Sequence, residues 1–209
     1  MRAFRLDDRE STREADRAAV QQRLGTGPGP GAVRVGYRDV ASRTNRVTLI
    51  AARLPPGVVS THTVFCSRRP LADDEAWCLV GLLNSLVVNY LVRLQVNVHV
   101  SASIMARLPV PRPSSDVQAQ LAVWARALGE VADAETLPDT YADLNAGVAD
   151  LYGLSTHEFR HVLSGFPLIP EALRERCAGA FAQRGRWRSI APYTHVPAVA
   201  PSSVTRMAP

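Results

Sequence analysis

An α+β fold is predicted for this chain: a small antiparallel β-meander packed on a long buried helix and followed by a helical C-terminal part. Short runs rich in β-branched residues come first, then a long apolar stretch without charge, and then several segments with helical periodicity. The chain has 209 residues, of which 46% are hydrophobic, so it is long and apolar enough to bury a core.

Three strands are expected over residues 33–40, 47–54 and 61–67. Turn-forming residues separate them, with Arg43-Thr44-Asn45 in the first connection and Pro55-Pro56-Gly57 in the second. Short connections between consecutive strands predict antiparallel pairing in chain order, which is a meander.

One long helix is expected over about residues 76–94, because no charge occurs from Ala76 to Val92 and Asp73-Asp74-Glu75 suits a helix start. Asn84, Ser85 and Asn89 interrupt the apolar run, which favours a helix buried in a protein core over a membrane span. The three cysteines form no metal or disulfide pattern, and no signal peptide is evident, so we expect a cytoplasmic protein without membrane contact.

The rest of the chain predicts one more strand and a series of helices. Alternation over residues 96–100 indicates a strand, and the prolines of residues 108–113 indicate a stiff, extended piece. Apolar residues at three- and four-residue steps then predict helices over 116–134, 139–151, 155–164 and 170–183. Ser155 and Glu158 form a capping box for the third of these helices.

Four regions follow from these patterns. Residues 1–32 are expected to hold a peripheral helix (residues 11–24) and a Gly/Pro hinge, and residues 33–113 an α/β recognition module. Residues 114–183 are expected to form a helical support region, and residues 184–209 a basic tail that is disordered.

Charge divides the chain more sharply than its net value of +5 suggests. All 24 basic residues are arginine, and residues 33–112 hold ten of them against four acids, a balance of +6. Residues 113–176 hold four arginines against ten acids, a balance of −6. The first segment suits a polyanion, whereas the second would repel one.

Catalytic motifs are scarce. The sequence has no dinucleotide-binding glycine pattern, no phosphate-binding loop and no GxSxG nucleophile elbow. His157, Glu158 and His161 do fit the HExxH pattern of a zinc hydrolase, but no third ligand follows and the pair falls in the first turn of a helix. We therefore expect no enzyme activity, cofactor or metal in this chain, and keep the zinc hydrolase as an alternative.

Three blocks of sequence resemble the C-terminal target-recognition region of type IIG restriction–modification enzymes and related phage-defence N6-adenine DNA methyltransferases. They are YRDVASRTNRVTLIAARLP at residues 37–55, the run from LLNS at residue 82 to LPVP at residue 111, and the run around LYGL at residues 151–154. The blocks keep the family's order over about residues 33–170. Val47 stands where the family usually has an arginine.

The resemblance implies a recognition fragment for double-stranded DNA that serves a methyltransferase subunit. That subunit would bind S-adenosylmethionine and carry an Asn-Pro-Pro-Tyr-type motif, both of which this chain lacks. Two alternatives remain, a protein-interaction module and a truncated, non-functional remnant of such an enzyme.

The candidate DNA-binding residues combine arginines, which suit phosphate and guanine, with short polar side chains that suit base edges. They are Arg34, Arg38, Arg43, Thr44, Asn45, Arg46, Arg68, Arg69, Asn97, His99, Ser101 and Ser103. Structural roles compete with this interpretation: Arg38 can pair with Asp39, and Asn45 can stabilise its own turn. Asn84 and Ser85 are expected to hold backbone rather than DNA, and the cluster Arg184, Arg186, Trp187 and Arg188 to contact phosphates or only solvent.

Overall fold

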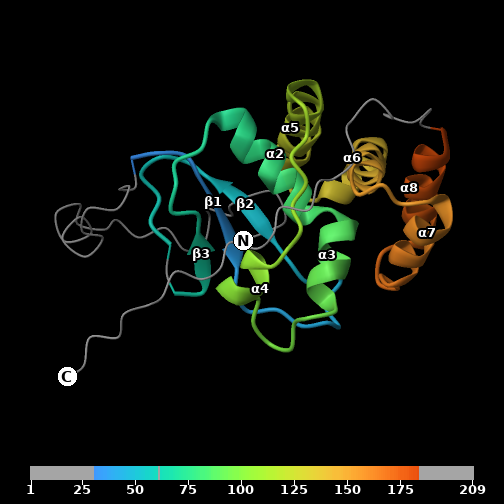
Figure 1. Cartoon of the computed structure of the whole chain (residues 1–209), viewed down its shortest axis with the longest axis horizontal. Coiled ribbons are helices and arrows are strands. Elements are labelled where there is room, and N and C mark those ends of the chain that lie inside the picture. Colours follow the sequence, from blue (N-terminus) through green and yellow to red (C-terminus); the bar gives the residue numbers. More distant parts are fainter. Residues whose placement is uncertain (1–30, 61, 184–209) are drawn as a thin grey trace.

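The computed structural model describes residues 31–60 and 62–183. The helix expected over residues 11–24, the hinge after it and the basic tail from residue 184 lie outside the described residues. Within the described part, the structure is an α+β fold, with a sheet at one side and a group of helices at the other (Figure 1).

The sheet consists of three antiparallel strands, β1 (Arg34–Arg38), β2 (Ala51–Leu54) and β3 (Val64–Cys66). Their order is β2-β1-β3, so the expected meander is wrong: β3 returns to the free side of β1. The turn between β2 and β3 contains Gly57 at φ 89°, a left-handed conformation that glycine adopts without strain.

A side chain explains why β3 does not pair with β2. Asn84 accepts a hydrogen bond from the Ala51 amide (3.0 Å) and donates one to the Ala51 carbonyl (2.9 Å). These are the groups through which β2 would bind a third strand in a meander. Asn84 therefore occupies this part of the outer edge of β2, and β3 pairs with β1.

The expected long helix is two helices, α2 (Asp73–Asn84) and α3 (Leu86–Arg93), which meet at an angle of 56°. Ser85 between them is extended, with ψ 153°; its hydroxyl donates to the Leu82 carbonyl and accepts from the Val88 amide. Asn145 accepts from the Leu86 amide at 2.7 Å. The break therefore leaves these backbone groups paired although they are buried.

In the part of the chain that the structure describes, no single helix is long and apolar enough to cross a membrane, and only the bent pair of α2 and α3 meets that test jointly.

The segment after α3 is less regular than expected. The strand expected over residues 96–100 is a single bridge between Val40 and His99, because β1 ends at Arg38 and only the chain just beyond it reaches this segment. A short helix, α4 (Ala102–Ala106), follows, and residues 109–114 have no regular structure. This agrees with the prediction that no helix or strand forms there, while the extended, stiff backbone expected for residues 108–113 stays a prediction.

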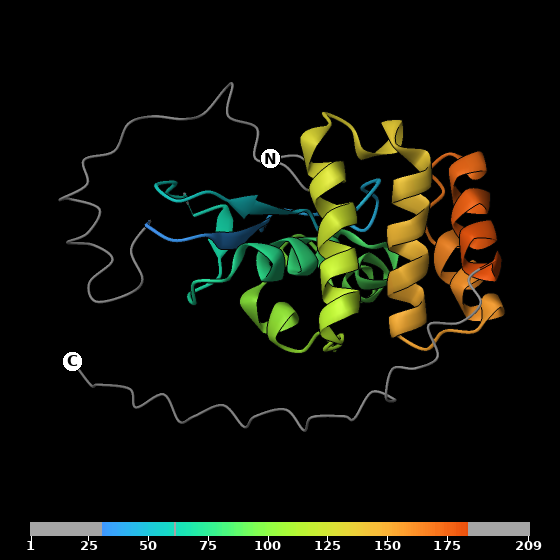
Figure 2. The same cartoon turned by 90° about the horizontal axis from the view of Figure 1, so that it is seen from above.

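The helical part contains α5 (Ser115–Glu130), a 3-10 turn η1 (Ala134–Thr136), α6 (Pro138–Leu151), α7 (Thr156–Ser164) and α8 (Glu171–Gln183). Figure 2 shows α5, α6 and α8 side by side, away from the sheet. Each predicted helix is present within a few residues of its expected bounds, and α7 begins with the expected capping box. One continuous core joins sheet and helices; among its fully buried side chains are Leu49, Leu86, Val88, Leu121, Leu128, Leu144, Phe159, Phe166 and Ile169.

Candidate nucleic-acid interface

The turn between β1 and β2 is built by hydroxyl groups. The Ser42 hydroxyl accepts from the Thr44 amide (3.2 Å) and lies 2.9 Å from the Thr44 hydroxyl, while the Ser42 carbonyl accepts from the Asn45 amide (3.2 Å). The structural role that the sequence suggested for the Asn45 side chain thus belongs to Ser42. These hydrogen bonds hold the backbone of residues 42–45 in one conformation. Arg43, Thr44 and Arg46 are exposed on the turn.

Arg93, the last residue of α3, forms hydrogen bonds to this turn. Its guanidinium donates to the carbonyls of Asn45 (2.6 Å) and Gly165 and to the Thr48 hydroxyl (3.1 Å). It also lies 4.2 Å from the ring centroid of Phe166, and burial lowers its pKa. Arg93 therefore ties the turn to α3 and to the end of α7 as one rigid unit.

A second segment, residues 96–101, lies directly against the chain after β1. The Ala41 amide donates to the Val98 carbonyl (2.9 Å), and the Val100 amide donates to the Asp39 carbonyl (2.8 Å). Figure 1 shows the two segments together at the lower edge of the molecule, next to α3 and α4. Two stretches that are more than 50 residues apart in sequence thus form one surface.

His99 joins the two segments a second time. Its Nδ1 lies 3.0 Å from a carboxylate oxygen of Asp39, and the His99 side chain is 58% exposed. Asp39 pairs with His99, so the structural alternative in which Arg38 pairs with Asp39 is not observed. Successive residues of a strand point to opposite sides of the sheet, which directs the two side chains apart.

Arg43 makes the third connection between the segments. Its Nε donates to the Val96 carbonyl (2.8 Å), and its Nη2 donates to the side-chain oxygen of Asn97 (3.1 Å). Both Arg43 and Asn97 are exposed. The sequence predicted both as DNA-binding residues, and the structure places them in contact.

Two further candidates adjoin this surface at the start of α4. The Ser101 hydroxyl caps that helix by accepting from the Ile104 amide (3.3 Å), and it lies 2.8 Å from the Ser103 hydroxyl. Ser101 therefore has a structural role, and Ser103 is the more exposed of the two. We call Arg43, Thr44, Asn97, His99 and Ser103 the loop surface.

Arg34, Arg68 and Arg69 lie away from the loop surface. Arg34 is only 8% exposed and donates to the Val58 carbonyl, and Arg38 on the same face of β1 is half-buried. Arg68 and Arg69 are exposed but follow β3, where Ser67 bonds Val35 near the start of β1. They therefore lie at the opposite end of the strand from the loop surface.

Arg46 is exposed like Arg43 but differs in its partner. Its guanidinium forms an ion pair with Glu135 of η1, which belongs to the acidic helical part. A carboxylate in this position competes with phosphate for the same donors.

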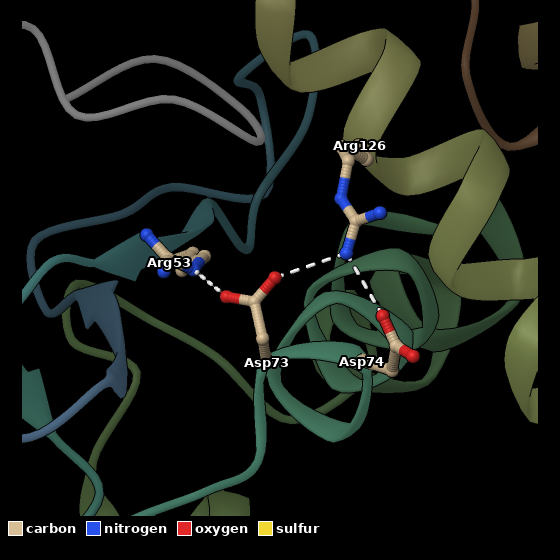
Figure 3. A network of polar contacts seen from close by, with 4 residues as sticks. All are labelled: Arg53, Asp73, Asp74 and Arg126. Atoms are coloured by element: carbon tan, nitrogen blue, oxygen red, sulfur yellow. Dashed lines mark hydrogen bonds and ion pairs between the residues drawn. The ribbon is translucent and has the colours of Figure 1, made fainter.

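The acids of the basic segment are largely neutralised within the fold. Asp73 pairs with Arg53 (2.6 Å) and Arg126 (2.9 Å), and Asp74 pairs with Arg126 (2.8 Å), so the start of α2 is tied to β2 and α5 (Figure 3). These contacts lie at the first turn of α2. Asp39, which contacts His99, is the acidic residue of this segment that adjoins the loop surface.

The HExxH residues have other partners. The Glu158 carboxylate accepts from the amide (2.8 Å) and hydroxyl (2.7 Å) of Ser155, and these hydrogen bonds lower its pKa. His161 Nε2 lies 3.0 Å from the Tyr90 hydroxyl. Among residues 31–60 and 62–183, no three histidine, cysteine or acidic side chains are grouped to hold a metal ion. The described part offers no ligand set for zinc.

Sequence reasoning missed the buried polar network that positions the loop surface. Asn89 accepts from the amides of Thr48 (2.9 Å) and Leu49 (2.8 Å), and so fixes the chain that leaves the turn. The available signal was two asparagines and one terminal arginine within the apolar stretch of α2 and α3, because such polar groups must find partners when buried. The prediction that Asn84 and Ser85 hold backbone is confirmed.

Comparison with protein-family models, with curated proteins and with solved structures found no match for this chain.

Proposed function

We propose that this chain is the double-stranded-DNA-recognition part of a restriction–modification or phage-defence adenine methyltransferase whose catalytic subunit is supplied separately. The observation that carries the proposal is the contact between Arg43 and Asn97. The resemblance to type IIG enzymes rests partly on the two blocks that contain these residues, and the fold joins them in one exposed surface.

The chemistry of the loop surface supports the proposal. It offers a guanidinium, an amide, an imidazole and hydroxyls on short, fixed backbone, which are the groups that contact base edges and phosphates. The supporting turn is held by Arg93 and by buried asparagines, so little ordering would be needed on binding. The helical part, in which residues 113–176 carry a balance of −6, would be directed away from the duplex and towards a protein partner.

Equilibrium binding tests the proposal. Fluorescence anisotropy with a labelled duplex should show binding at low salt and a linear fall of log affinity with log salt between about 50 and 200 mM. A methyltransferase encoded beside this chain would be added in a parallel series. If neither series binds duplex at low salt, the proposed function is wrong.

A zinc hydrolase remains testable by metal analysis of the purified chain. Stoichiometric zinc that is lost on substitution of His157 and His161 would favour it over DNA recognition. The engagement of Glu158 in the α7 cap argues against a role as general base.

A further inference from the structure

We propose that Arg43 reads a guanine base in the major groove, through the end of its guanidinium group that the protein leaves free. The inference rests on the proposed function and deepens it, because it names a base and the residue that selects it. The supporting observation is the pattern of hydrogen bonds that the Arg43 guanidinium makes.

A guanidinium has five N–H donors in one plane. In Arg43, the Nε donor and one Nη2 donor form one side of this fork, and both are bonded, to the Val96 carbonyl and to the Asn97 side chain. The donors at the far end, on Nη1 and Nη2, have no partner in the described part of the chain. The free end of the fork is therefore exposed and its direction is fixed by two anchors.

Guanine is the base that matches this free end. On the major-groove edge it presents two acceptors, O6 and N7, whereas adenine presents one acceptor and one donor and cytosine presents a donor. A group that only donates satisfies both positions of guanine, meets a donor on adenine and on cytosine, and finds one acceptor and a methyl group on thymine. The two anchors also remove side-chain freedom before binding, which lowers the entropic cost of the contact.

Anchoring distinguishes a base contact from a phosphate contact. Phosphate oxygens accept from many directions, so a free arginine or lysine suffices to neutralise them. An arginine held at Nε and Nη2 meets acceptors in one plane and one direction only. This restriction suits a base edge at a defined position of the target.

Selection from a random duplex pool tests the inference with the full chain, as wild type, Arg43→Ala and Arg160→Ala. Alanine removes every donor and one positive charge at either position. Arg160 is the matched control, because it is exposed and pairs with Glu175 in the helical part. We expect wild type and Arg160→Ala to select the same motif, and Arg43→Ala to lose preference at one guanine of that motif.

Modified duplexes then identify the base contact. Replacing that guanine with 7-deazaguanine removes the N7 acceptor and keeps O6, and should weaken wild-type binding by up to roughly 150-fold, the upper end for one bidentate contact. The same replacement should leave Arg43→Ala unaffected. Asn97→Ala, which removes one anchor, should reduce preference at the same position and at no other.

Each contrary outcome has a distinct meaning. Unchanged base preferences in Arg43→Ala, or equal wild-type affinity for guanine and 7-deazaguanine, would overturn the inference and assign Arg43 to phosphate. Wild-type binding without any base preference would overturn it too, while leaving DNA binding in place. If the wild type retains no duplex at low salt, the proposed function fails and the inference fails with it.

Discussion

The side chain of Asn84 bonds both main-chain groups of Ala51 and thereby takes the place of a neighbouring strand at the edge of β2. Asn84 is 3% exposed, and its amide nitrogen also donates to the Val80 carbonyl at 3.0 Å. One buried residue thus occupies the edge of β2 at Ala51 and fixes β2 to the end of α2.

Substitution of Asn84 by alanine should lower the free energy of unfolding by about 2–4 kcal/mol, because the Ala51 amide and carbonyl would be buried without partners. Urea unfolding followed by circular dichroism measures the loss. The control is Asn97→Ala at an exposed position, which should change stability by less than about 0.5 kcal/mol. Equal stabilities of the two variants would contradict the edge-capping role of Asn84.

Arg93→Lys should destabilise the protein by about 1–3 kcal/mol although it keeps the charge. An ammonium group does not span the Asn45 carbonyl, the Thr48 hydroxyl and the Gly165 carbonyl, which lie around the planar guanidinium. The measurement is again urea unfolding, with Arg160→Lys as the exposed control. A lysine variant as stable as the control would show that the turn does not depend on the fork of Arg93.

Glu135→Gln should strengthen duplex binding. The substitution releases Arg46 from its ion pair and adds a phosphate donor at the edge of the loop surface. The slope of log affinity against log salt should become steeper by about 0.9, the value for one additional phosphate contact. Glu175→Gln makes the same charge change beside Arg160, away from the loop surface, and should leave the slope unaltered; equal effects would indicate only a change in net charge.

Thiol reactivity should distinguish the three cysteines. Burial raises the pKa of Cys78 and of Cys177 to about 12, so neither forms the reactive thiolate between pH 7 and 9, whereas Cys66 is only half-buried. Titration with a disulfide reagent should modify one thiol in the native protein and three after denaturation. Two or more fast thiols in the native state would contradict the packing of α2 or α8.

Much of the fold could be predicted from local patterns in the sequence. The helices after residue 114 follow from apolar periodicity, and the cap of α7 follows from Ser155 and Glu158, because both signals act within a few residues. The strand segments were also predicted close to their observed positions.

The strand order and the break between α2 and α3 could not be predicted in this way. Both depend on partners distant in sequence: Asn84 bonds Ala51, and Asn145 bonds the Leu86 amide across the α2–α3 junction. Composition marks such asparagines as unusual in an apolar helix but does not identify the backbone groups that they bind.

The candidate site was predicted in part. Arg43, Asn97 and His99 lie on one surface, while Arg34 is buried and Arg68 and Arg69 lie at the other end of β1. Charge and residue type do not distinguish these cases. The sequence shows an arginine at each position, but it does not show whether the side chain is buried against a carbonyl or exposed on a turn.

Duplex DNA is proposed to bind the loop surface and to avoid the helical part, and amide hydrogen exchange of the full chain with and without duplex tests this proposal most directly. Exchange over residues 39–46 and 96–103 should slow on addition of DNA at low salt, while exchange in α6, α7 and α8 stays unchanged. Protection confined to those helices, or no change anywhere in the chain, would contradict it.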